Sequence, residues 1–107
     1  MIRFYRATFQ QPVEDTDADG QVIQRYDDQF EDRVTMRFLR GGESVMSARL
    51  ESRSPVIIGI RNSSRARLIT SEWRVRIDGR VYDMKEDPRP TENRRDLEML
   101  AESRGAE

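Results

Sequence analysis

Short runs in which apolar and polar residues alternate constrain the fold of this chain more than any other feature. They occur at residues 5–9, 21–26, 34–39 and 73–77. Alternation with a period of two residues is typical of β-strands that bury one of their faces. The chain has 107 residues, of which 36% are hydrophobic, and we expect one domain that spans 1–107. We predict a mainly β fold, a small single-domain barrel or sandwich of about six short strands with one short helix.

Turn residues predict where these strands end. Pro12 is expected to stop the first run, and the aspartate-rich segment 15–20 to form a turn before the second. Asp78-Gly79 predicts the type I′ turn of a hairpin whose second strand is 81–84.

The remaining segments give mixed signals. In 43–50, apolar residues lie four apart, which favours a short helix of about two turns. Pro55 is expected to end that segment, and the β-branched run at 56–60 predicts the most buried strand. Loops are expected at 61–67 and 86–91. The segment 96–102 fits a helix by residue preference and a strand by alternation.

Histidine and cysteine are absent from the sequence, which excludes many function classes. Ser-His-Asp and Cys-His catalysis, Cys/His zinc sites and disulfides all require them. The carboxylates of residues 92–102 are paired in sequence with Arg94 and Arg95, so no isolated acid pair suggests acid-base catalysis. We expect no enzyme activity and no cofactor. Because no signal-like start and no membrane-length apolar run is found, we expect a protein made in a reducing cytoplasm.

Charge is unevenly distributed along the chain, although the net charge is only −1. Residues 1–32 carry 3 basic and 8 acidic side chains, 33–82 carry 11 and 4, and 83–107 carry 5 and 8. Lys85 is the single lysine, so nearly all basic residues are arginines, which suit bidentate pairing with carboxylate or phosphate. Either a GC-rich genome explains this composition, or acidic and basic faces of neighbouring copies meet in an assembly.

One local motif resembles half of a calcium-binding loop. Asp15, Asp17 and Asp19, followed by Gly20, match the first part of an EF-hand loop. The twelfth position is Tyr26, where calcium needs a bidentate glutamate. We therefore interpret the motif as a hairpin tip and expect no metal site.

A second motif places Arg61, Arg65 and Arg67 in one polar loop. Three guanidinium groups and the neighbouring hydroxyls make a donor-rich loop that could hold phosphate. No aromatic residues are interleaved to stack on bases. A solvated loop or a protein interface is the favoured interpretation.

The order of the predicted elements carries a family resemblance over about residues 7–102. Its most specific parts are Asp78-Gly79-Arg80-Val81-Tyr82 and Arg94-Arg95-Asp96-Leu97-Glu98-Met99-Leu100. In this order the elements resemble the phage head-tail joining family, the head-closure or stopper proteins of long-tailed phages. The last segment is a strand that closes the barrel in that family, so the resemblance implies a strand at 97–100. Gene transfer agents use the same connector parts.

The resemblance implies a structural subunit of the virion, assembled in the host cytoplasm. The expected partners are further copies in a six- or twelve-fold ring, portal and adaptor proteins on the head side, and a tail terminator on the tail side. DNA is expected to pass through the channel without sequence-specific contact, and no membrane is involved.

Two groups of residues are candidates for contacts in such a ring. Candidate subunit contacts are Arg61, Arg65 and Arg67. The candidate channel-facing loop holds Glu14, Asp15, Asp17 and Asp19, whose carboxylates would repel the DNA backbone. The alternative is a small β-barrel module that binds nucleic acid or protein and has no virion role.

Overall fold

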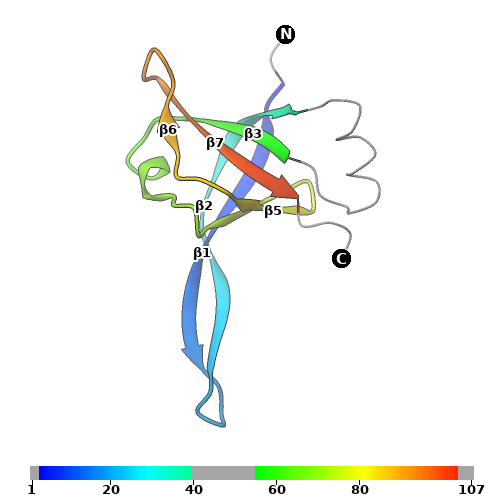
Figure 1. Cartoon of the computed structure of the whole chain (residues 1–107), viewed down its shortest axis with the longest axis vertical. Helices are drawn as coiled ribbons and strands as arrows, with labels where there is room; N and C mark the ends of the chain where they lie inside the picture. Colours follow the sequence, from blue (N-terminus) through cyan, green and yellow to red (C-terminus); the bar gives the residue numbers. More distant parts are fainter. Residues whose placement is uncertain (1–2, 40–54, 104–107) are drawn as a thin grey trace.

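The computed structural model describes residues 3–39 and 55–103, and it confirms a mainly β fold (Figure 1). In chain order these residues form β1 (Tyr5–Thr16), β2 (Val22–Phe38), β3 (Pro55–Arg61), the 3-10 turn η1 (Ala66–Leu68), β4 (Arg74–Ile77), β5 (Arg80–Met84), β6 (Arg89–Pro90) and β7 (Asp96–Ser103). The short helix expected at 43–50 lies outside the described residues.

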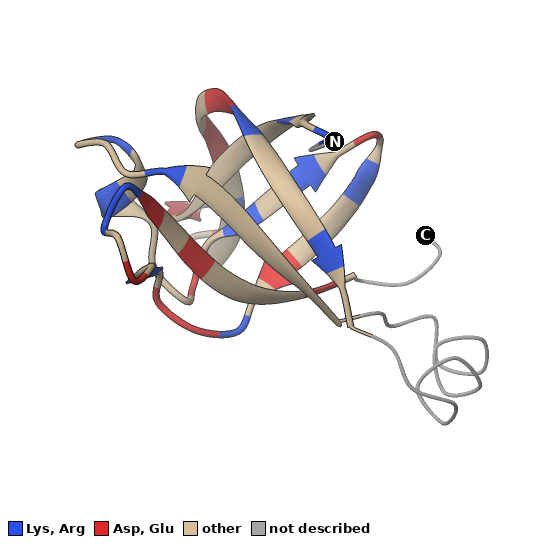
Figure 2. Cartoon of the chain, turned by 90° about the horizontal axis from the view of Figure 1, so that it is seen from above, with Lys and Arg blue, Asp and Glu red and all other residues tan. Residues whose placement is uncertain are grey.

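Six of these strands pair in a closed circuit. β1 pairs with β2 and with β4, β2 pairs with β3, and β4 pairs with β5. β7 completes the circuit by pairing with β3 along one edge and with the end of β5 along the other. All these pairs are antiparallel, and β6 extends the β5 edge of β7. The result is an irregular, barrel-like sheet, which Figure 2 shows from above.

Alternate residues of the strands fill the interior. In β3, Val56, Ile58 and Ile60 are buried, whereas the residues between them are half-buried. β7 repeats this pattern, with every second residue from Leu97 to Ser103 buried. Each large aliphatic side chain buried in this way stabilises the fold by about 1.5–3 kcal/mol. The strand expected at this end of the chain is therefore confirmed, because tertiary packing overrides its helix preference.

The expected hairpin of β4 and β5 is also confirmed. Asp78 and Gly79 have φ values of 53° and 77°, and a type I′ turn requires positive φ at both central residues. Val75 and Ile77 of β4 are buried in the core, so the hairpin contributes one wall of the barrel.

The two N-terminal strands are longer than expected, and the prediction that Pro12 ends the first strand is wrong. β1 continues to Thr16. Pro12 lies opposite Tyr26, beyond the pairing of β1 with β4, and a proline is tolerated where a strand has only one neighbour. The runs at 21–26 and 34–39 belong to one strand, β2. The charged residues between them extend the strand outside the core, where no apolar alternation is needed.

Two other segments differ from the expected ones. Pro55 is the first residue of β3, and the segment that it is expected to end lies outside the described residues. The loop expected at 61–67 leads into η1, where Ala66 is buried, and the loop expected at 86–91 contains β6. Both loops therefore lie against the barrel at least in part.

Residues 11–28 of the β1–β2 hairpin form a two-stranded arm that leaves the barrel and points down in Figure 1. We call this segment the arm. The pairing shifts at its base, where Phe9 lies opposite Phe30 but Gln10 lies opposite Asp28. Such a β-bulge bends the strand and increases its twist, so the arm departs from the curvature of the barrel.

A polar network holds the base of the arm against β4. Gln10 is only 5% exposed, and its amide oxygen accepts a hydrogen bond from Arg74 Nε at 2.7 Å. Its amide nitrogen donates to Asp28 Oδ1, also at 2.7 Å. The Arg74 guanidinium lies 4.0 Å from the centre of the Tyr26 ring. Together these contacts fix the direction of the arm.

We expect Gln10→Leu to lower the free energy of unfolding by about 1–3 kcal/mol, because it leaves Arg74 and Asp28 without their hydrogen bonds at a part-buried position. Gln24→Leu is the matched control, since Gln24 is exposed on the same face of the arm. Its effect should stay within about 0.5 kcal/mol. Urea denaturation measures both variants, and equal stabilities would contradict the anchoring role of Gln10.

Candidate functional site

Four exposed arginines gather at one end of the barrel, which we call the arginine end. Arg61 is the last residue of β3, Arg67 lies in η1, and Arg94 and Arg95 directly precede β7. The pairing of β3 with β7, in which Arg61 lies opposite Asp96, brings these segments together. They lie on the left-hand side of the molecule in Figure 2.

Asn62 ties the two loops of the arginine end to each other. Its backbone N–H donates to the Arg95 carbonyl at 2.9 Å, and its Nδ2 donates to the Arg94 carbonyl at 3.2 Å. Its Oδ1 accepts a hydrogen bond from Arg67 Nη1 at 2.8 Å. Arg94 has a φ of 62°, uncommon for a residue other than glycine, and its N–H donates to the Thr91 carbonyl at 3.0 Å. These hydrogen bonds therefore fix the backbone of the two loops that carry the arginines.

Within residues 3–39 and 55–103, the four arginines of the arginine end form no ion pair, although Asp96 lies opposite Arg61 in the strand pairing. The ion pairs there involve other basic residues, and Arg67 bonds only to the Asn62 amide. Arg61, Arg94 and Arg95 have no carboxylate partner in those ranges. Because guanidinium groups match carboxylates and phosphates, this surface is suited to an acidic partner.

The three arginines suggested by the sequence differ in their contacts. Arg61 and Arg67 belong to the arginine end, whereas the exposed Arg65 contacts side chains of β2. Its guanidinium lies 5.0 Å from the centre of the Phe30 ring, and its Nη2 is 3.9 Å from Asp32 Oδ2. Arg65 therefore has partners within its own subunit.

Arg94 and Arg95 are site residues that the sequence does not single out. Their local signal is only a tandem of two arginines in a polar segment. Their relation to Arg61 depends on the pairing of β3 with β7, which no local pattern specifies.

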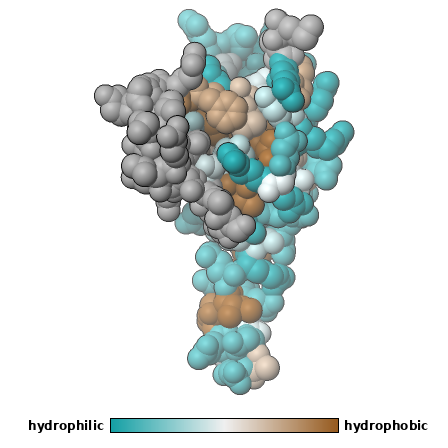
Figure 3. All heavy atoms as spheres, turned by 90° about the vertical axis from the view of Figure 1, so that its right-hand side faces the viewer, coloured by the Kyte–Doolittle hydropathy of each residue, from teal (hydrophilic) through white to brown (hydrophobic). Residues whose placement is uncertain are grey.

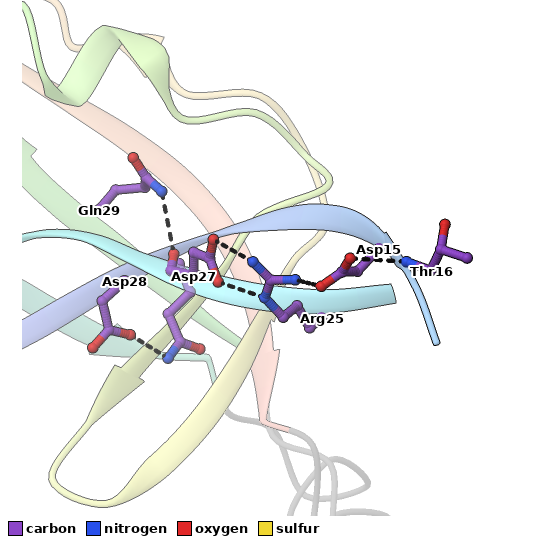
Figure 4. A network of polar contacts seen from close by, with 7 residues as sticks. Asp15, Thr16, Arg25, Asp27, Asp28 and Gln29 are labelled. Atoms are coloured by element: carbon purple, nitrogen blue, oxygen red, sulfur yellow. Dashed lines mark hydrogen bonds and ion pairs between the residues drawn. The ribbon is translucent and has the colours of Figure 1, made fainter. Parts of the chain in front are cut away.

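The arm carries the opposite charge. Residues 11–28 include 6 acidic side chains and 1 basic one. The candidate channel-facing residues Glu14, Asp15, Asp17 and Asp19 all lie toward its far end. Figure 4 shows Arg25 between Asp15 and Asp27, with which it forms ion pairs. Hydrogen bonding to Asp27 raises the pKa of Arg25, and the charge of Asp15 raises it further, so this arginine stays charged.

The aspartate-rich segment forms the turn of the arm, as expected. Asp17 Oδ1 accepts hydrogen bonds from the backbone N–H groups of Asp19 and Gln21, both at 2.9 Å. Gly20 has a φ of 81°, which this tight turn requires. In the part of the chain that the structure describes, no group of three or more acidic residues could hold a metal ion.

The far end of the arm also exposes apolar side chains. Val22 is 68% exposed and Ile23 is 44% exposed. Ile23 shares one face of the hairpin with Val13, whereas Val22 lies on the other face. Figure 3 shows an apolar patch on the lower part of the molecule, in the arm. We call residues 13–23 the tip of the arm. An apolar patch on a two-stranded segment without a core of its own is typical of a contact surface.

A groove beside the arginine end runs over the outer face of β2, β3 and β7 and is lined by both polar and apolar residues. Its lining includes Phe4, Thr35, Gly59, Arg61 and Asp96. A Cβ atom at Gly59 would lie 2.6 Å from Thr35 Oγ1, so a larger residue there would require a neighbour to move.

Within the described residues, no helix is long and apolar enough to cross a membrane.

A comparison with known families decides which interpretation of these surfaces applies. The model of the family described as phage head completion protein matches residues 4–104. The chain belongs to the phage head completion protein family. This head completion protein is therefore a structural component of a virion, and the resemblance found in the sequence is confirmed. The family favours the virion role over a binding module outside the virion.

Two solved structures share the fold of this head completion protein. A Shigella flexneri 2a protein, solved in solution, has a TM-score of 0.71 and 21% identity, with 99% of this chain and 96% of that chain covered. A chain from the virion of a native gene transfer agent particle has a TM-score of 0.67 and 17% identity, with 99% and 100% covered. No curated protein matches the sequence.

We expect Arg65→Ala to lower the free energy of unfolding by about 0.5–1.5 kcal/mol, because it removes the contacts with Phe30 and Asp32. Arg95→Ala should change it by less than about 0.5 kcal/mol, because Arg95 is exposed and its side chain has no partner among the described residues. Thermal and urea unfolding measure both. A larger loss of unfolding free energy in Arg95→Ala than in Arg65→Ala would contradict the contacts of Arg65 with Phe30 and Asp32.

Proposed function

We propose that this head completion protein acts as an oligomeric ring, six- or twelve-fold, at the head-tail junction. In this position the ring lies beneath the portal and adaptor, closes the DNA-filled head and offers an attachment surface to the tail terminator. Membership of the head completion family supports the place in the virion. The gene transfer agent virion includes a chain of the same fold, which agrees with a role in a particle.

The observation that carries the ring is the separation of charge on so small a domain. The arginine end lacks carboxylate partners among the described residues, while the arm is acidic and lacks a core. The two lie at different extremities of the chain in Figure 1. A ring of head-to-tail contacts needs two different surfaces on each copy, one for each neighbour. Arg61 and Arg67 fit such a contact, whereas Arg65 is engaged within its own subunit.

The acidic tip has two possible positions in such a ring. Facing the channel, Glu14, Asp15, Asp17 and Asp19 would repel the phosphates of DNA and let it slide. Facing a neighbour, the same side chains would meet basic groups. The unpaired arginines and the exposed apolar groups of the tip favour the neighbour.

Each contact of this kind is weak by itself. Exposed ion pairs contribute about 0–1 kcal/mol each, so one substitution should have a small effect on a subunit. A contact repeated around a ring acts at every interface, which multiplies its effect on assembly. Changes in charge should therefore impair joining more than folding.

Electron microscopy of lysates made without this protein tests the proposal. We expect separate heads and tails, with DNA lost from the heads, and restoration of joined particles by the wild-type gene supplied in trans. Normally joined particles in the deletion lysate would refute the role in head completion.

Paired variants refine this test. Arg61→Glu with Arg67→Glu should fold normally and fail to restore joined particles. Arg80→Glu is the matched control, because Arg80 is exposed on the β4–β5 hairpin, away from the arginine end. Equal complementation by both variants would place the subunit contact elsewhere.

A further inference from the structure

We propose that the tip of the arm of one copy docks on the arginine end of the next copy. The proposal rests on the ring argued above and names the two surfaces that form its repeated contact. The docking partner is a second copy of this chain, bound through carboxylates and apolar side chains of its tip.

The charges of the two surfaces are complementary. The tip, residues 13–23, carries four acidic side chains and no basic one. The arginine end presents Arg61, Arg67, Arg94 and Arg95, all exposed. At the tip, Glu14 and Asp19 have no side-chain partner in the described ranges, and at the arginine end Arg61, Arg94 and Arg95 have none. The carboxylates of the tip can therefore pair with the guanidinium groups of the arginine end.

The tip is built to be covered by protein. Val22 and Ile23 are exposed beside the acidic turn, on opposite faces of the hairpin, and exposed apolar side chains gain stability when they are removed from water. The arm also has unpaired strand edges, because β1 loses its second neighbour after Gln10 and β2 pairs with β3 only from Val34 onward. A two-stranded hairpin of this kind is marginally stable until it gains a partner.

One copy does not satisfy both surfaces by itself. The base of the arm is held by Gln10, Arg74 and Tyr26, which direct it away from the barrel. In Figure 1 the tip lies at the bottom, whereas the loops of the arginine end lie at the upper left. The contact must therefore join different copies, and because its two halves differ, it is heterologous and propagates from copy to copy.

Nucleic acid is a weaker candidate for the arginine end. Neither of the two arginine loops contains an aromatic residue for base stacking, and among the described residues the exposed aromatic ring beside them is the single Phe4 in the groove next to Arg61. A phosphate partner would also leave the apolar tip of the arm unexplained.

Cysteine crosslinking tests the docking without competing native thiols, because the native chain contains no cysteine. One copy carries Ala18→Cys at the tip, and a second, differently tagged copy carries Glu92→Cys at the arginine end; both positions are exposed. Under mild oxidation of the mixed full-length chains we expect a disulfide-linked heterodimer. Arg80→Cys in place of Glu92→Cys is the control and should give little product.

Salt and charge reversal then test the cause of the crosslink. The heterodimer should be lost in about 1 M NaCl, where screening acts over roughly 3 Å. It should also be lost when the Glu92→Cys copy carries Arg94→Glu with Arg95→Glu. It should return when the Ala18→Cys copy carries Glu14→Arg with Asp19→Arg. Equal crosslinking to the Arg80→Cys control, or no rescue by the reversed pair, would overturn the docking.

A DNA-binding measurement separates the other partner class. One outcome is that duplex DNA binds the wild-type chain and not the variant Arg94→Glu with Arg95→Glu, while the heterodimer is absent. In that outcome the arginine end binds phosphate and the docking is wrong. The ring at the head-tail junction has its own test in the deletion lysate. Unjoined particles in that lysate without the heterodimer would leave head completion intact and remove only the docking.

Discussion

The pairing of β3 with β7 is the interaction on which the core and the candidate site both depend. It joins Pro55–Arg61 to the last described strand in antiparallel register and closes the circuit of strands. The inward residues of these strands, Ile58 and Met99 among them, fill the core. The outward ends of the same pair carry the arginines. A shift of one residue would turn every side chain to the opposite face, so the register that builds the core also positions the charges.

The arm depends on a different kind of support. It has no apolar interior, and its direction is set at its base by Gln10, whose side chain bonds to β4 and to β2. The bulge between the Phe9 and Gln10 pairs lets the hairpin leave the barrel without breaking the sheet. Phe30 stacks on Phe9 just above that point, with ring centres 5.0 Å apart, and closes the core there. The molecule thus divides into a barrel-like sheet with its own apolar core and an arm without one.

Those parts of the fold that local chemistry specifies could be predicted from the sequence. Asp78-Gly79 defines its turn because few other pairs accept positive φ at both positions. The alternating residues at 73–77 also belong to a strand that buries one face, so their pattern is clear. The full length of β2 could not be predicted, because residues 27–33 lie largely outside the core and need no pattern. Pro12 suggested the end of the first strand, but at this position β1 has lost only its pairing with β4 and continues beside β2.

The site was less predictable than the fold, because it combines segments that are far apart in the chain. A sequence shows that Arg61, Arg65 and Arg67 are close in number, but it does not show that the short turn η1 directs Arg65 toward Phe30. It also does not show that Arg94 lies near Arg61, which follows only from strand pairing. The position of the acidic residues of the arm was easier to predict, because residues of one turn motif are close in both sequence and space.

The separation of the arginine end from the acidic tip has a consequence for how the subunits meet. A net charge of −1 conceals charges of opposite sign at the two extremities of the subunit. Two such subunits orient each other before they touch, because opposite charges attract during the diffusional approach. Higher ionic strength therefore both slows the encounter and weakens the ion pairs of the contact, and the apolar side chains are the part of the contact that salt does not weaken.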